Sequence, residues 1–219
     1  MDKAEIEQDL ANTINHMAVG VLAQYANANQ ISFIHISTDY VFDGSRDTPL
    51  SEDELTSPIN VYGHTKLAGE QLAMEYNPNT IIIRTSWVYS EFGNNFVKTM
   101  MRLMEERDQI SVVNDQIGSP TYAADLAQVL VTIVNYPIWK PGIYNYSNEG
   151  EVSWFEFAQA IQRIGKFDCQ IQGIPTASYP TPATRPAFSL LDKNKIKSTF
   201  GITIPYYADS LQKCMTKLG

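Results

Sequence analysis

The amino-acid sequence predicts an α/β fold, in which a truncated Rossmann-like, doubly wound parallel sheet is joined to a smaller mixed α/β substrate-binding lobe. Two observations support this prediction. Short runs rich in β-branched residues, at 31–36 and 80–85, have apolar side chains on both faces, as is typical of strands buried in a parallel sheet. Segments with helical spacing of apolar residues alternate with these runs, and such alternation favours a doubly wound architecture.

The predicted elements follow one another along the chain. The expected helices span 9–27, 61–76, 94–107, 123–135 and about 153–164, with two short ones that open at Asp192 and Tyr207. The expected strands are 31–36, 80–85, 110–113 and 142–146. Ser153 and Glu156 form a Ser-x-x-Glu capping box at the start of a helix. Four prolines between Ile174 and Pro186 predict an extended loop.

Composition and charge exclude several functional classes. The chain has 219 residues, a formal net charge of -8 and no basic cluster, whereas proteins that bind nucleic acid usually carry basic patches. Its apolar runs are too short to span a membrane, and its acidic, polar start is unlike a secretory signal. Cys169 and Cys214 lie far apart, so both are expected to be reduced thiols. We therefore expect a cytoplasmic protein that binds neither nucleic acid nor membrane and has no metal site.

Candidate catalytic residues stand at the end of the first strand and on the next helix. Ligands of open α/β sheets bind at the carboxyl ends of the strands, where Thr38 and Asp39 are expected. Tyr62 and Lys66 are four residues apart, so both project from one side of a helix. A nearby ammonium lowers the pKa of a phenol from about 10, so that the pair can exchange a proton with a carbonyl or carbinol oxygen. Thr38 can hydrogen-bond the same oxygen, and a hydride donor would complete a carbonyl reduction.

The Tyr-x-x-x-Lys spacing is weak evidence by itself. A second copy, Tyr136 to Lys140, contains Pro137 and lies in a proline-flanked turn, so we interpret it as chance. Tyr62 and Lys66 are favoured because a buried strand that ends in Ser-Thr-Asp precedes them.

Longer motifs extend over essentially the whole chain. They are Ser37–Gly44, Pro58–Glu70, Arg84–Tyr89, Gly93–Phe96, Asn114–Thr121 and Tyr179–Pro186. On these motifs the chain resembles the dTDP-4-dehydrorhamnose reductase family, which belongs to the extended short-chain dehydrogenases/reductases. The residue after Asp39 is Tyr40, whereas sugar-nucleotide dehydratases of the same superfamily carry a second carboxylate there. The resemblance therefore favours simple reduction over dehydration.

The resemblance implies a reaction and roles for particular residues. Such enzymes reduce the 4-keto group of dTDP-4-dehydro-6-deoxy-L-mannose to give dTDP-L-rhamnose, with NADPH or NADH as cofactor. Tyr62 would be the proton donor, Lys66 its helper and a ligand of the cofactor ribose, and Thr38 the hydroxyl that tunes the site. Thr38, Asp39 and Trp87 would contact the nucleotide sugar.

Two of the implied substrate ligands have plain structural alternatives. Trp87 would serve equally well as an aromatic residue of the core. Arg185 suits a diphosphate, because a guanidinium binds such oxygens in pairs, but a surface ion pair would also account for it.

The start of the chain departs from the family pattern. Its twelve glycines include no G-x-G and no G-x-x-G pair, the turn that holds a pyrophosphate in such proteins. We therefore expect a sheet that lacks about two βαβ units, roughly 60 residues, and cofactor binding through the ribose end alone. The strand at 31–37 would have an unpaired edge, and Phe33, Ile34 and Ile36 would lose cover on both faces. Because an exposed apolar edge favours pairing with another chain, we expect a homodimer through this edge, or aggregation, rather than a stable monomer.

The expected organisation leaves three functions open. Residues 1–92 would form the residual nucleotide-binding part with the catalytic residues, and 93–219 mostly the substrate-binding lobe, with an interleaved boundary. The chain could be an NAD(P)H-dependent reductase, a non-catalytic sugar-nucleotide-binding or regulatory subunit of the same fold, or an inactive fragment. The presence of Thr38, Tyr62 and Lys66 together favours the reductase.

Overall fold

The central element of the fold is a parallel three-stranded sheet. A computed structural model describes residues 1–218 of the chain. The strands are β1 (Ile34–Thr38), β2 (Ile81–Thr85) and β7 (Gly142–Tyr146), in the order β1-β2-β7. Their register aligns Thr38 with Thr85 and Thr85 with Tyr146, so the last residues of all three strands meet at one edge of the sheet.

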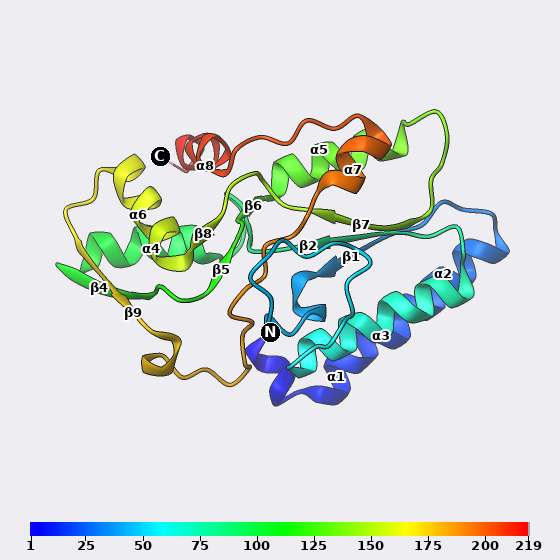
Figure 1. Ribbon diagram of the computed structural model, residues 1–219, viewed down its shortest axis with the longest axis horizontal. Helices are drawn as coiled ribbons and strands as arrows, with labels where there is room; N and C mark the ends of the chain where they lie inside the picture. The colour runs from blue at the N-terminus through cyan, green and yellow to red at the C-terminus, as the bar shows by residue number, and fades with distance from the viewer. Residues whose placement is uncertain (219) are drawn as a thin grey trace.

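Helices cover both faces of this sheet, as the doubly wound prediction requires (Figure 1). On one face α3 (Val61–Tyr76) packs against β1, and α2 (Ala18–Ala28) packs against α3. On the other face α5 (Ala123–Val134) and α7 (Asn194–Phe200) share a hydrophobic core with β2 and β7. The α/β class and the parallel pairing are therefore confirmed.

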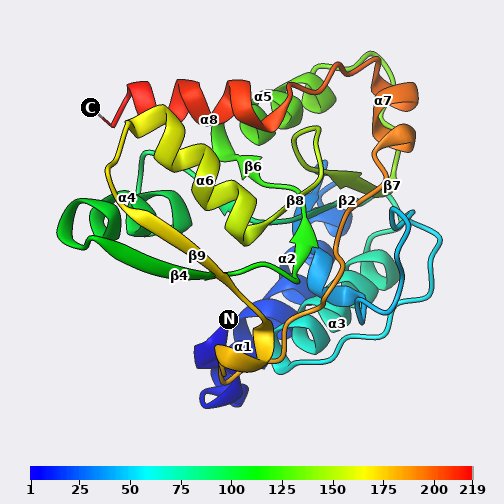
Figure 2. The same cartoon turned by 60° about the vertical axis from the view of Figure 1, so that its left-hand side comes forward.

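A second group of elements builds the mixed lobe beside the sheet (Figure 2). Its elements are α4 (Phe96–Glu106), β4 (Gln109–Val113), α6 (Trp154–Gly165), β9 (Gln170–Ile174) and α8 (Tyr207–Thr216). The parallel pair β4–β9 and the three helices share one core cluster. Both β7 and α5 follow residue 93 in the chain, yet β7 belongs to the central sheet and α5 packs against it. The elements of the sheet and of the lobe therefore alternate along the sequence.

Short strand pairs connect the sheet to the lobe. They are β3 (Val88–Tyr89) with β6 (Thr121–Tyr122), and β5 (Ile117–Gly118) with β8 (Val152–Ser153). These strands of two residues and β9 were not predicted. Two residues are too few for a period of two to be visible, and Gly173 with two glutamines interrupts the apolar pattern of β9.

The first predicted helix is one continuous helical segment of three parts. It comprises α1 (Gln8–Asn12), the π-helical turn η2 (Thr13–Met17) and α2, preceded by the short turn η1 (Asp2–Glu5). The wide turn lets the Asn15 carbonyl approach α3 at Gly69, where a Cβ atom would collide with it. Asn15 Nδ2 also donates to Thr65 Oγ1 at 3.1 Å, which fixes the turn against α3.

The edge of the sheet is only partly as expected. The strand β1 pairs with β2 on one side and has no second strand among residues 1–218. The expected loss of cover is wrong, because Phe33 packs on Val19 and Ala23 of α2, and Ile34 and Ile36 are half-buried against the core beneath α5 and α7.

Exposed apolar side chains instead gather on the N-terminal helical segment. Each has half or more of its surface accessible: Ile6, Leu10, Ile14, Met17, Val21, Leu22 and Tyr25. We call this set the N-terminal apolar stripe. None of the described helices is both long and apolar enough to cross a membrane.

A buried ion pair attaches α3 to the central strand. Arg84 of β2 and Glu70 of α3 have side chains only 3% and 2% exposed, and Arg84 Nη2 and Nε donate to Glu70 Oε2 and Oε1 at 2.7 and 3.0 Å. The guanidinium also lies 5.2 Å from the centre of the Phe42 ring. This two-point contact sets the position of α3 along the sheet.

Removal of one partner should therefore destabilise the fold strongly. We expect Glu70→Ala to lower the free energy of unfolding by about 3–5 kcal/mol, because it leaves a buried guanidinium without a counter-charge. The matched control is Glu106→Ala on the exposed Arg102–Glu106 pair, which should change stability by less than about 0.5 kcal/mol. Urea denaturation measures both, and a loss below about 1 kcal/mol for Glu70→Ala would contradict this assignment.

Candidate functional site

The site is built where β1 ends. Thr38 Oγ1 donates to Asp39 Oδ1 at 3.0 Å and accepts the Tyr40 N–H at 3.2 Å, which starts the turn η3 (Asp39–Val41). Both Thr38 and Asp39 are buried. The strand end thus presents a hydroxyl and a carboxyl group together, as the sequence predicted.

Burial makes the Asp39 carboxyl group a weaker acid than usual. Desolvation raises the pKa of its carboxyl group to about 6, although hydrogen bonds from Ser189 and Thr38 act in the opposite direction. Within residues 1–218, Asp39 Oδ2 has no hydrogen-bond partner. An unpartnered buried carboxyl oxygen is costly, and such costs are typical of a group that meets a ligand.

Three contacts fix the first turn of α3, which carries Tyr62. The cap residue Asn60 accepts the Gly63 N–H at 2.7 Å, and Glu5 Oε1 accepts the Val61 N–H at 2.8 Å. Gly63 lies directly against the Tyr40 carbonyl, where a Cβ atom would not fit. The helix start is therefore held against the loop that follows β1.

Tyr62 lies beside Thr38 and Asp39 in a buried environment. Burial raises the pKa of the Tyr62 phenol, the charge of Asp39 raises it further, and the Thr38 hydroxyl acts in the opposite direction. The expectation that Lys66 lowers this pKa is wrong, because the shift is upward. The phenol consequently keeps its proton at neutral pH and is a proton donor in this state.

Lys66 points toward β1. Its Nζ donates to the Ile36 carbonyl at 2.6 Å and lies 3.3 Å from His35 Nε2. Burial lowers the pKa of Lys66, while Glu70 opposes the shift. Burial and the Lys66 charge lower the pKa of His35 to about 3, so this imidazole is neutral and accepts from the ammonium.

Trp87 follows the central strand and has a strained backbone. Its φ angle is 47°, in the left-handed region, which costs a non-glycine residue about 1–2 kcal/mol. Its indole stacks on Trp154 with ring centres 3.6 Å apart and planes 12° apart. Trp87 is half-buried at the margin of the lobe core. It therefore belongs to the core on one side and remains accessible on the other.

Arg185 forms an ion pair, which was the structural alternative to a role in diphosphate binding. Its Nη2 donates to the two oxygens of Asp2 at 2.9 and 3.2 Å, and its Nη1 donates to the Ala183 carbonyl at 3.2 Å. The loop that carries Arg185 is tied to α3, because Asn60 Nδ2 donates to the Thr184 carbonyl at 2.8 Å. Arg185 thus lies next to the site, with its charge already paired.

The structure brings some of the predicted site residues together and leaves others further away. Thr38 and Asp39 are buried with the half-buried Tyr62 beside them, and Lys66 lies one helical turn further on. Sequence reasoning missed Glu5 and Ser189. Neither has a local signal, because their partners at Val61 and Asp39 are distant in the chain.

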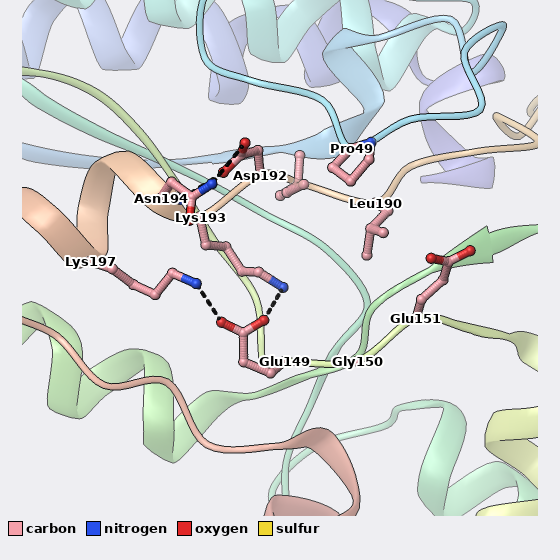
Figure 3. A pocket seen from close by; sticks show the side chains of 10 residues that line it. Pro49, Glu149, Gly150, Glu151, Leu190, Asp192, Lys193, Asn194 and Lys197 are labelled. Carbon is pink, nitrogen blue, oxygen red and sulfur yellow. Dashed lines mark hydrogen bonds and ion pairs between the residues drawn. The ribbon is translucent and has the colours of Figure 1, made fainter.

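A separate hollow of about 320 Å³ lies between the loop that follows β7 and the start of α7 (Figure 3). Glu149 projects into it and pairs with Lys193 at 3.1 Å and Lys197 at 3.0 Å. Burial would raise the pKa of Glu149, but the two lysines together lower it. None of the described residues that line the hollow is a predicted site residue, and both of its lysines are paired with Glu149.

Comparison with known proteins gives one consistent result. The family model for the RmlD substrate binding domain matches residues 1–219. The dTDP-4-dehydrorhamnose reductase of Aggregatibacter actinomycetemcomitans is 44% identical over 212 residues, which cover 92% of this chain and 72% of that protein. The reductase of Salmonella typhimurium is 39% identical, with 100% of this chain and 76% of the relative covered.

Solved structures agree with the sequence relatives. The dTDP-4-dehydrorhamnose reductase of Clostridium acetobutylicum superposes with a TM-score of 0.95 at 36% identity, and that of Bacillus anthracis, solved in complex with NADP, with 0.94 at 38% identity. Both comparisons cover 100% of this chain and 77% of the solved chain.

The raised pKa of Asp39 predicts a specific pH dependence of stability. Because folded Asp39 binds its proton more tightly than unfolded Asp39, this group favours folding fully below about pH 4, and the contribution is lost as the pH rises through about 6. We expect Asp39→Asn to be more stable than the unaltered chain at pH 7 by up to about 3 kcal/mol. That difference should disappear below about pH 4.

Urea denaturation between about pH 4 and pH 7.5 tests this expectation. The control is Asp43→Asn, because Asp43 is exposed and its hydrogen bonds to Ser45 lower its pKa rather than raise it. A stability difference for Asp39→Asn that stays constant over this range would show that Asp39 is not a buried acid of this kind.

Proposed function

Because the chain belongs to the dTDP-4-dehydrorhamnose reductase family, we propose that it reduces the 4-keto group of dTDP-4-dehydro-6-deoxy-L-mannose to give dTDP-L-rhamnose, with NADPH or NADH as reductant. The observation that carries this proposal is the protonated phenol of Tyr62 beside the Thr38 hydroxyl at the carboxyl edge of the sheet. A proton donor and a hydrogen-bonding hydroxyl at one point are what a carbonyl oxygen needs as it becomes an alcohol.

Each of the site side chains has its own role in the proposed reaction. Tyr62 gives its proton to the carbonyl oxygen at C4, and Thr38 holds that oxygen in place. Asp39, with its unpartnered Oδ2, accepts from a sugar hydroxyl. Trp87 provides an apolar wall against the deoxysugar ring. Arg185 takes the diphosphate, for which its ion pair with Asp2 must open or share the guanidinium.

The residues around Lys66 fit the ribose end of a nicotinamide cofactor. The Lys66 ammonium is held by a carbonyl and a neutral imidazole, and within residues 1–218 no carboxylate lies within ion-pair distance of it. Its remaining donor capacity suits ribose hydroxyls, and Tyr62 lies on the same side of α3. The bound cofactor supplies the hydride that the carbonyl carbon receives.

Substitution of Tyr62 tests the proposed reaction. We expect Tyr62→Phe to reduce the rate of NADPH oxidation with the keto-sugar nucleotide by roughly 10²–10⁴-fold, since this removes the acid group. The matched control is Tyr136→Phe in the second Tyr-x-x-x-Lys segment, which should leave turnover unchanged. Near-normal turnover in Tyr62→Phe would place the proton donor elsewhere, and binding of the sugar nucleotide without turnover by the unaltered protein would favour a non-catalytic binding subunit.

We also propose a cytoplasmic homodimer that forms through the N-terminal apolar stripe and the adjoining open edge of β1. The stripe joins seven largely exposed apolar side chains on one helical segment, and contiguous patches of this kind commonly mark association surfaces. Among residues 1–218 no strand pairs with the other side of β1, so that side is a second candidate surface for association.

Charge introduced into the stripe should weaken this association. We expect Ile14→Glu/Val21→Glu to shift the protein from dimer to monomer in light scattering coupled to gel filtration. Val131→Glu/Val134→Glu is the control, because these α5 residues are similarly exposed but lie outside the stripe. A monomeric unaltered protein, or a dimer that persists in Ile14→Glu/Val21→Glu, would contradict the proposal.

A further inference from the structure

The strained conformation of Trp87 requires support from its surroundings. A non-glycine residue remains in the left-handed region only where neighbouring contacts hold it there. Backbone contacts fix the chain on either side, because Ser86 Oγ donates to the Ser119 carbonyl at 2.7 Å and the Thr121 N–H donates to the Trp87 carbonyl at 3.2 Å. The ring itself is held by a different residue, Trp154.

Trp154 is held in place by the capped start of α6. It is the first residue of α6, directly after the cap Ser153, whose side chain and backbone form a reciprocal capping box with Glu156. Ser153 also pairs with Ile117 in the β5–β8 ladder. On its other side the Trp154 ring meets Phe96 of α4, with ring centres 4.6 Å apart. The stack between Trp154 and Trp87 is therefore anchored from several directions.

Gly118 connects this aromatic stack to the buried acid of the site. A Cβ atom at Gly118 would lie 2.9 Å from Cε2 and Cζ2 of Trp87 and 2.8 Å from Ser189 Oγ. The Ser189 hydroxyl in turn lies close enough to Asp39 to lower the pKa of its carboxyl group. Trp87 and Asp39 thus lie near the same glycine, one directly and one through Ser189, which places the indole next to the buried acid.

We propose that Trp154 is a positioning residue for the deoxysugar. Its stacked ring fixes the orientation of the Trp87 indole, whose backbone has a left-handed conformation. The accessible part of the Trp87 indole forms the surface against which the sugar packs. This inference rests on the proposed function, since it takes the ligand to be a dTDP-deoxysugar. Trp154 itself stays in the core cluster and acts through Trp87. The role concerns the sugar and not the nucleotide.

Calorimetric titration with two probes, dTDP-L-rhamnose and dTDP, separates sugar contacts from nucleotide contacts. We expect Trp154→Leu, which keeps an apolar side chain but removes the flat ring, to weaken dTDP-L-rhamnose binding by about tenfold and dTDP binding by less than about twofold. Trp154→Phe should restore most of the sugar-dependent affinity, because a planar ring can again stack on Trp87. Trp139→Phe is the control and should change neither affinity, since Trp139 lies outside the stack and bonds the Asn79 carbonyl.

Near-ultraviolet circular dichroism gives a readout that a purely structural role would not move in this pattern. The coupled signal of two stacked indoles should be lost in both Trp154→Leu and Trp154→Phe, whereas only Trp154→Phe retains affinity for the sugar. Unchanged binding of dTDP-L-rhamnose by Trp154→Leu would overturn the proposal, as would equal loss of both probes. An unaltered protein that binds dTDP but gains nothing from the sugar would contradict the proposed function as well.

Discussion

The buried ion pair between Arg84 and Glu70 is the interaction on which the site depends. It joins the central strand to the middle of α3 at two points, in an interior where an unpaired charge would be costly. Since Tyr62 and Lys66 lie on the same helix, about two turns and one turn before Glu70 respectively, the ion pair also fixes where their side chains meet β1. The helix cannot slide along the sheet without separating these charges.

The carboxyl edge of the sheet carries costs that a purely structural region would avoid. Asp39 is buried with an unpartnered oxygen and a raised pKa, and Trp87 has a left-handed backbone. Both features are unfavourable for folding, and both lie at the ends of adjacent strands. Local violations of this kind are expected where a protein meets its ligand, because binding can supply the missing partner.

The sequence predicted the elements whose signals are local. The limits of α3 and β7 were predicted to the residue, and local signals mark both starts: Asn60 caps α3, and Pro141 directly precedes β7. The pKa direction of Tyr62 was not, since a spacing of four residues says nothing about burial. The partner of Arg185 was equally invisible, because Asp2 lies 183 residues away in the chain. The contacts that the sequence did not predict are those between segments that lie far apart in the chain.

Lys66 illustrates how one side chain can serve the fold and the chemistry together. The Phe33 carbonyl accepts from Ile81 on the β2 side, and carbonyls alternate in direction along a strand, so the Ile36 carbonyl points to the open edge of β1. Lys66 donates to that carbonyl and thereby satisfies an acceptor that a neighbouring strand would otherwise pair. The same contact holds the ammonium at the side of β1 that faces away from β2, beside the helix that carries Tyr62. The lysine is thus oriented directly by the sheet edge, while the Arg84–Glu70 ion pair sets the position of the helix that carries it.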